Sequence, residues 1–183
     1  MAVESTMVEL GTPAPDFELS DLTGTRHRLS DHAGSPALVM FLCNHCPYVK
    51  HVERPLAELV AEYEERGVVA FGVMSNDADR SPDDSPADLA DQAERAGFSF
   101  PYLIDVDQSV GRAYRAACTP DFFVYDADHR LAYRGRMDAA TPGNDQPNDG
   151  AELRAALDAV LAGEPAPEPQ RPPMGCSIKW REA

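Results

Sequence analysis

Hydrophobic residues form two short continuous runs in the first half of the chain, at 37–42 and 68–74. Runs of this length are typical of strands that are buried on both faces of a parallel sheet. Between them, from residue 48 to residue 66, apolar residues recur every three or four positions, which predicts an amphipathic helix. Gly67 is its expected stop, and Pro55 inside it is expected to kink it.

The rest of the chain continues the alternation of strands and helices. Alternating residues on both sides of a turn at Gly24, from residue 17 to residue 29, predict a β-hairpin near the N-terminus. The pattern then predicts, in order, a polar loop (75–84), a helix (85–96), a strand (101–105), a helix (109–117), two antiparallel strands (122–125 and 131–135), a turn-rich loop (141–150) and a last helix (151–161). This order predicts an α/β fold with a mixed central sheet flanked by helices.

The chain is expected to form one domain over residues 1–162, followed by a Pro-rich tail over residues 163–183. A length of 183 residues with 43% hydrophobic content is enough for one core. The tail is extended and semi-rigid at about 3.1 Å per residue, so it can reach across a domain of this size. Its end carries Ile178 and the only tryptophan, Trp180, which are costly to leave in water. We therefore expect both side chains to dock on the domain.

The acidic charge of the chain argues against two classes of partner. A formal net charge of −15 disfavours binding to a nucleic-acid backbone or to an anionic membrane. The first 17 residues have neither the basic nor the apolar region of a secretory signal, and no apolar run reaches membrane-spanning length. We expect a cytoplasmic protein with no bound organic cofactor, since no glycine-rich phosphate loop is present.

The candidate chemistry lies in the segment Cys43-Asn44-His45-Cys46, between the first apolar run and the predicted helix. The first turn of a helix has unpaired N–H groups and the positive end of the helix dipole, which stabilise a sulfur as thiolate. A second sulfur about one turn further on can close a disulfide and release whatever the first has attacked. The spacing predicts thiol–disulfide exchange, with an accessible Cys43 as nucleophile and Cys46 as resolving thiol.

Two other interpretations of this segment remain open. Both cysteines could simply pack as small hydrophobic residues. Alternatively Cys43, His45 and Cys46, joined by His51, could bind a metal such as copper, although no second C-x-x-C or H-x3-H completes the usual set of four ligands. The first interpretation does not require this spacing, so catalysis is preferred and no metal is expected.

The residues resemble the thioredoxin superfamily and, within it, the peroxiredoxin-like AhpC/TSA branch. The resemblance covers residues 15 to about 161: an extended N-terminal segment, the C-x-x-C pair after a central strand, Thr119-Pro120 before a strand pair, and a final helix. It implies a thioredoxin-like fold in which a cis Thr119–Pro120 peptide lies beside Cys43 and faces an extended substrate peptide. It also implies a protein or small-molecule disulfide as substrate and a thiol as electron donor.

The chain differs at three positions from typical thioredoxins or typical peroxiredoxins. Leu42 and Ala37 stand where thioredoxins have a tryptophan and a buried acid, so the proton acceptor is missing or comes from elsewhere. Met40 stands where peroxiredoxins have a hydroxyl that orients peroxide. Peroxide reduction through a sulfenic acid on Cys43 is the alternative function, and it ends in the same oxidised pair.

Three further residues are candidates for the redox site. His45 precedes the second cysteine, as in disulfide-forming relatives, and its imidazolium can stabilise a Cys43 thiolate, or it is only an exposed polar residue. Cys118 lies two residues before Pro120 and is a redox candidate or a buried bystander. Cys176 lies in a Gly-Cys-x-Ile-Lys-Trp ending that resembles the peroxiredoxin-like group. A docked tail would bring it near another thiol as a resolving or regulatory cysteine.

Overall fold

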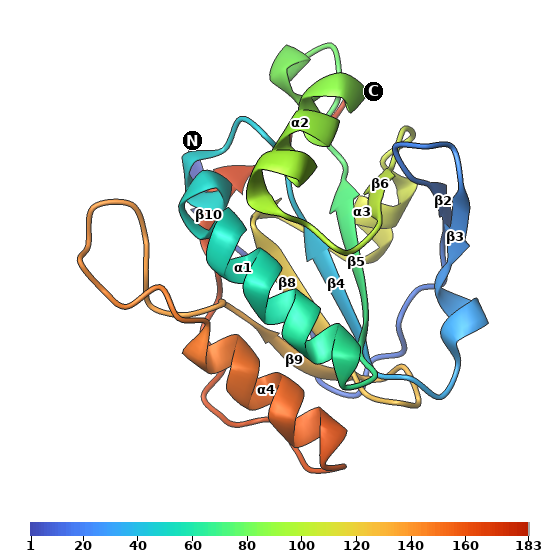
Figure 1. Ribbon diagram of the computed structural model, residues 1–183, viewed down its shortest axis with the longest axis vertical. Coiled ribbons are helices and arrows are strands. Elements are labelled where there is room, and N and C mark those ends of the chain that lie inside the picture. Colours follow the sequence, from blue (N-terminus) through green and yellow to red (C-terminus); the bar gives the residue numbers. More distant parts are fainter. Residues whose placement is uncertain (183) are drawn as a thin grey trace.

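The computed structural model describes residues 1–182 and contains the predicted mixed sheet (Figure 1). Five strands lie in the order β6-β5-β4-β8-β9. β4 is parallel to β5 and antiparallel to β8, so the sheet changes direction beside its central strand. The strands are β4 (Ala37–Phe41), β5 (Val69–Met74), β6 (Tyr102–Ile104), β8 (Asp121–Tyr125) and β9 (Leu131–Gly135).

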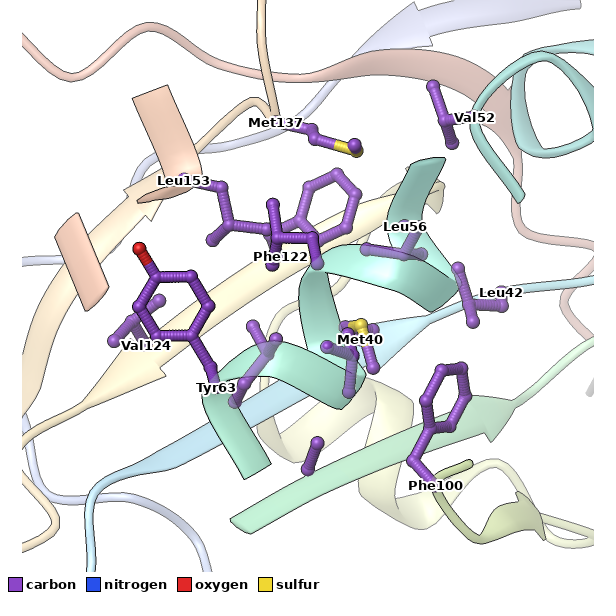
Figure 2. Packing of buried hydrophobic residues seen from close by; sticks show 14 of the residues in the cluster. Met40, Leu42, Val52, Leu56, Tyr63, Phe100, Phe122, Val124, Met137 and Leu153 are labelled. Atoms are coloured by element: carbon purple, nitrogen blue, oxygen red, sulfur yellow. The ribbon is translucent and has the colours of Figure 1, made fainter. Parts of the chain in front are cut away.

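The helices and the hairpin cover the two faces of this sheet. They are α1 (Pro47–Glu65), α2 (Pro86–Ala96), α3 (Ser109–Ala113), α4 (Ala151–Leu161), β2 (Glu18–Ser20) and β3 (Arg26–Arg28). On one face Leu56 of α1 and Leu153 of α4 pack over Met40 and Phe122 of the strands (Figure 2). The other face packs against α3 and the segment that carries the hairpin. The antiparallel β2–β3 hairpin is confirmed.

The boundaries of two helices illustrate how local sequence sets them. The side chain of Ser85 accepts a hydrogen bond from the N–H of Asp88 at 3.2 Å, and Gly97 ends α2 with φ +80°, as the sequence predicts. The predicted helix 109–117 is too long, because α3 ends at Ala113 and Arg115 adopts the left-handed conformation with φ +56°. No helix in the described part of the chain has the length and apolar character needed to cross a membrane.

A second sheet joins both ends of the chain, and sequence patterning does not predict it. Its strands are β1 (Ala2–Glu4), β10 (Met174–Ser177) and β7 (Cys118–Thr119), in the order β1-β10-β7 with antiparallel pairing. In Figure 1 β10 lies next to the N-terminus and the first turns of α1. Beyond β10, Ile178 is buried in the core, and the Arg112 guanidinium stacks on Trp180 at 4.6 Å from the ring centroid. The tail therefore lies against the domain over residues 174–180.

A buried ion pair lies next to the second sheet. Arg134 of β9 and Asp121 of β8 pair with both side chains fully buried. The guanidinium also donates to the Thr6 carbonyl at 3.0 Å and to the Ser5 hydroxyl, and it lies 3.8 Å from the centroid of the Phe123 ring. The pair thus fixes the segment after β1 to the central sheet.

Candidate functional site

The two cysteines of the C-x-x-C segment lie at the predicted junction of strand and helix. Cys43 follows the end of β4, and Cys46 is the N-cap residue of α1, with Pro47 as the first helical residue. The Cys43 Sγ lies 3.1 Å from the Thr119 hydroxyl oxygen, and the Cys46 Sγ lies 3.2 Å from the Thr119 carbonyl oxygen. The Thr119–Pro120 peptide is cis. Its expected position beside Cys43 is confirmed.

Both sulfurs are sealed from solvent in this arrangement. Cys43 and Cys46 are each 0% exposed, so the expectation of an accessible Cys43 is wrong for this form of the protein. The C-terminal tail lies against the site: Cys176 of β10 pairs with Thr119 and packs against the cluster of buried residues that includes Cys43 and Cys46. All four cysteines are free, and only Cys176 is partly exposed.

The environment divides the negative charge unequally between the paired thiols. The interactions with Cys43, with Cys176 and with the N–H of Val49 in the first turn of α1 lower the pKa of Cys46, against the effect of burial. The hydrogen bond to Cys46, burial and the nearby charge of Asp84 raise the pKa of Cys43. This environment therefore favours the thiolate on Cys46 over Cys43, whereas the sequence predicts it on Cys43.

A buried carboxylate, Asp84, holds the segment between the cysteines in place. Its oxygens accept from the backbone N–H groups of Asn44 and His45 at 2.7 and 3.2 Å and from the Asn76 amide at 2.9 Å. The His45 Nδ1 lies 2.7 Å from the same carboxylate. Burial raises the pKa of Asp84, but the hydrogen bonds from His45 and Asn76 outweigh it, so the pKa is below its usual range. The hydrogen bond to Asp84 in turn raises the pKa of His45, which favours its imidazolium form.

Sequence reasoning missed Asp84 and placed it in a polar loop. The only local signal is an acid directly before the helix start at Ser85, which is too common to indicate a site. The structure brings its carboxylate within 4.8 Å of the sulfur of Cys43. Asp84 is therefore a buried acid beside Cys43, at a different place in the sequence from Ala37.

We expect the change Asp84→Asn to lower the pKa of His45 toward its ordinary value, because the imidazolium loses its charged partner. The titration of the His45 ring protons by NMR measures this shift. Asp83→Asn is the matched control, since the Asp83 side chain makes no hydrogen bond with His45 in the described residues, and it should leave the His45 titration unchanged. Equal titrations of His45 in Asp84→Asn and the parent protein would contradict the assignment.

The Asp84–His45 pair makes the free energy of unfolding depend on pH, and its contribution falls as pH rises. The pKa of His45 is higher in the folded than in the unfolded protein, so this stabilisation is fully present below the unfolded pKa and is lost as pH rises through the folded value. The difference in free energy of unfolding between the parent protein and Asp84→Asn should therefore shrink as pH rises through the folded pKa of His45. Urea unfolding across this range measures the difference, and a difference that grows with pH would contradict the account.

The ligand set of the metal alternative is not brought together as expected. Among the described residues, one group of potential ligand atoms lies within 4.8 Å of one another, and it comprises Cys43, His45 and Asp84. Neither Cys46 nor His51 belongs to this group. His45 already uses one ring nitrogen on Asp84.

Cys118 lies close to the site, but its thiol points to backbone groups. Its sulfur donates to the carbonyls of Pro120 at 3.6 Å and Pro173 at 3.9 Å. Burial raises the pKa of Cys118, so its thiol stays protonated. The structure therefore brings Cys118 next to Thr119 without turning its sulfur into a charged nucleophile.

Comparison with known proteins places this geometry in a family. The AhpC/TSA family profile matches residues 10–134. The thiol-disulfide oxidoreductase ResA of Geobacillus thermodenitrificans is 31% identical over 128 residues, which is 70% of each chain. The crystal structure of an uncharacterised conserved protein from Geobacillus kaustophilus is 47% identical, with a TM-score of 0.96 over 100% of this chain and 98% of its own.

A more distant structure shows how far the fold extends. A Chlorobium tepidum protein described as a putative thiol:disulfide interchange protein DsbE superposes with a TM-score of 0.68 at 22% identity, covering 85% of this chain and 99% of its own. At this identity the likeness concerns the thioredoxin-like fold alone. The profile match spans well over half of the chain, and the chain, which has the thioredoxin-like fold, belongs to the AhpC/TSA family.

Proposed function

We propose that Cys43 and Cys46 are the exchanging thiols of this thiol–disulfide oxidoreductase, with Cys43 as nucleophile toward the substrate and Cys46 as resolving thiol. The observation that carries the proposal is the convergence of both sulfurs on Thr119, the residue before the cis proline. The relatives named as thiol–disulfide oxidoreductases support the enzyme class, and the peroxidase alternative has less support. Thr119 and Pro120 form the platform that faces the substrate once β10 has moved aside.

In the proposed reaction, two electrons pass from the cysteine pair to a substrate disulfide. The Cys43 sulfur attacks one substrate sulfur, forms a mixed disulfide and releases the other substrate sulfur as a thiolate. The proton of Cys43 passes to the hydrogen-bonded Cys46 thiolate during this attack. Cys46 then attacks the Cys43 sulfur, its proton goes to the first released thiolate, and the second substrate sulfur leaves as a thiolate. A thiol donor reduces the resulting Cys43–Cys46 disulfide.

His45 tunes this cycle through its charge. A protonated imidazole between the two cysteines favours thiolate over thiol, which stabilises the reduced pair and makes the disulfide a better oxidant. The hydrogen bond to Asp84 raises the pKa of His45, which favours the imidazolium, and orients its ring. Asp84 is thus a positioning residue that acts through His45.

The substrate class is tested by comparing three activities of the purified, reduced protein. We expect catalysed reduction of a protein disulfide such as insulin in the presence of dithiothreitol, because the paired thiols suit exchange. Peroxide-dependent thiol consumption is the second assay, and bound copper or zinc in the freshly purified protein is the third. Peroxide turnover without insulin reduction would replace the proposal by the peroxidase alternative. Stoichiometric metal without either activity would replace it by the metal-handling alternative.

Location and the other partners stay predictions. The cytoplasm is the location expected from the sequence, and in that compartment a C-x-x-C pair is more often catalytic than structural. The net charge of −15 continues to argue against nucleic acid and anionic membranes as partners. Cysteine labelling in cells would test the location, since an oxidising compartment would leave the pair as a disulfide in the steady state.

A further inference from the structure

We propose that Cys176 is a third redox cysteine, which takes over the disulfide from Cys43 by exchange at the Cys46 sulfur. The inference rests on the proposed function and extends it from a two-cysteine to a three-cysteine cycle. The three-cysteine cycle explains how electrons from a thiol donor reach a buried cysteine pair, because Cys176 is the only partly exposed cysteine of the four.

Backbone pairing places Cys176 at the active site. β10 runs antiparallel to β7, with Cys176 opposite Thr119 and Ser177 opposite Cys118. The carbonyl oxygen of Thr119 is also the group that the Cys46 sulfur contacts at 3.2 Å. Cys46 and Cys176 therefore both adjoin Thr119, and Cys176 packs against the buried cluster that contains Cys46.

Gly175 makes this close approach possible. A Cβ atom at this position would collide with the carbonyl oxygen of Thr119, so every other residue type would push β10 away from β7. Because the Gly175 backbone lies against the Thr119 carbonyl, the next residue, Cys176, is also held beside the Thr119–Pro120 segment. Gly175 therefore allows β10 to place the Cys176 sulfur at the site.

The remaining tail holds β10 in this position from its other end. The Ile178 side chain is 4% exposed in the core, and the N–H of Lys179 donates to the Asn76 side chain at 2.8 Å. Asn76 also donates to Asp84, the carboxylate that binds His45. The anchor of the tail and the segment between the two catalytic cysteines therefore share one hydrogen-bonded network.

The exchange step needs no outside oxidant or reductant. In the oxidised protein the Cys176 sulfur attacks the Cys46 sulfur, the Cys43–Cys46 bond breaks, and the Cys46–Cys176 bond forms. The proton of Cys176 passes to Cys43, which leaves as a free thiol. The number of disulfides is unchanged, and the disulfide has moved from a sealed pair to a partly exposed sulfur that a donor thiol can attack.

The variant C43S isolates the Cys46–Cys176 bond that this step forms. Oxidation of C43S with glutathione disulfide should produce an intramolecular Cys46–Cys176 disulfide and two glutathione molecules, detected as one linked peptide by mass spectrometry without reduction. In the parent protein, graded glutathione buffers should give the same linked peptide beside the Cys43–Cys46 form. Exchange of Cys118 for serine in C43S is the control and should leave the yield of the linked peptide unchanged.

A second variant tests the placement of β10 by the glycine. Adding G175A to C43S should lower the yield of the Cys46–Cys176 peptide by about tenfold at the same glutathione ratio, because the added methyl group displaces the strand. The same change should speed alkylation of Cys46. M174A is the matched control in the same strand, since its side chain is exposed, and it should change neither readout.

The outcomes separate the two proposals. Insulin reduction by the parent protein, together with free Cys176 in oxidised C43S and in every glutathione buffer, would overturn the three-cysteine cycle and leave the proposed function intact. A Cys46–Cys176 peptide in a protein that reduces no disulfide substrate would overturn the proposed function alone. If C43S does not fold, the linked peptide in the parent protein decides.

Discussion

Replacing Cys43 or Cys46 by serine is expected to lower catalysed disulfide reduction by at least about 10³-fold, the scale on which removal of a nucleophile acts. A serine hydroxyl cannot form the mixed disulfide at residue 43 or resolve it at residue 46. Insulin reduction under steady-state conditions measures the loss. Cys118→Ser is the matched control, because its buried sulfur donates to backbone carbonyls, and it should retain most of the activity.

The two serine variants should also fail in different ways. Cys46→Ser is expected to accumulate a mixed disulfide between Cys43 and the substrate, because the resolving thiol is missing. Cys43→Ser should accumulate none. Mass spectrometry under non-reducing conditions distinguishes the two, and a stable adduct on Cys46 of the Cys43→Ser variant would reverse the assigned roles.

Replacing Arg134 by alanine is expected to lower the free energy of unfolding by about 3–5 kcal/mol. The change leaves Asp121 buried without its cationic partner and removes the donors to Thr6 and Ser5. Urea unfolding measures the loss, and the dependence of the free energy of unfolding on urea concentration should stay unchanged. Because Asp121 directly follows Pro120, we expect the cysteine pair of this variant to become accessible to alkylation as well.

Two control variants test whether the loss of stability comes from the buried Arg134–Asp121 pair. Arg66→Ala removes an exposed ion pair with Asp158 and should have a much smaller effect. Replacing Arg134 by methionine together with Asp121 by leucine should restore part of the stability, since neither charge is then left buried alone. A loss in Arg134→Ala no larger than that in Arg66→Ala would contradict the assigned role of the buried pair.

The central sheet and the cysteine junction could be predicted from the sequence because their signals are local. Continuous apolar runs mark β4 and β5, the three-to-four spacing marks α1, and the C-x-x-C segment lies between them. The resemblance adds the position of Thr119 and Pro120, which no local pattern gives. Each of these features depends on residues that are close in sequence or on a recognisable motif.

The environment of the cysteines could not be predicted, because distant segments create it. β1 and β10 are three and four residues long, and their pairing with β7 depends on backbone contacts that side-chain periodicity does not encode. Asp84 reaches Cys43 only through the folding of the loop after β5. These contacts seal the sulfurs and favour a thiolate on Cys46 rather than on Cys43, where the sequence predicts it.

The most direct test is a redox titration of the parent protein in dithiothreitol buffers, with mapping of every disulfide by mass spectrometry. The account predicts one two-electron transition in which Cys46 passes from a free thiol into an intramolecular disulfide, with Cys43 or Cys176 as its partner. A Cys46 thiol that remains free for alkylation under fully oxidising conditions would contradict it.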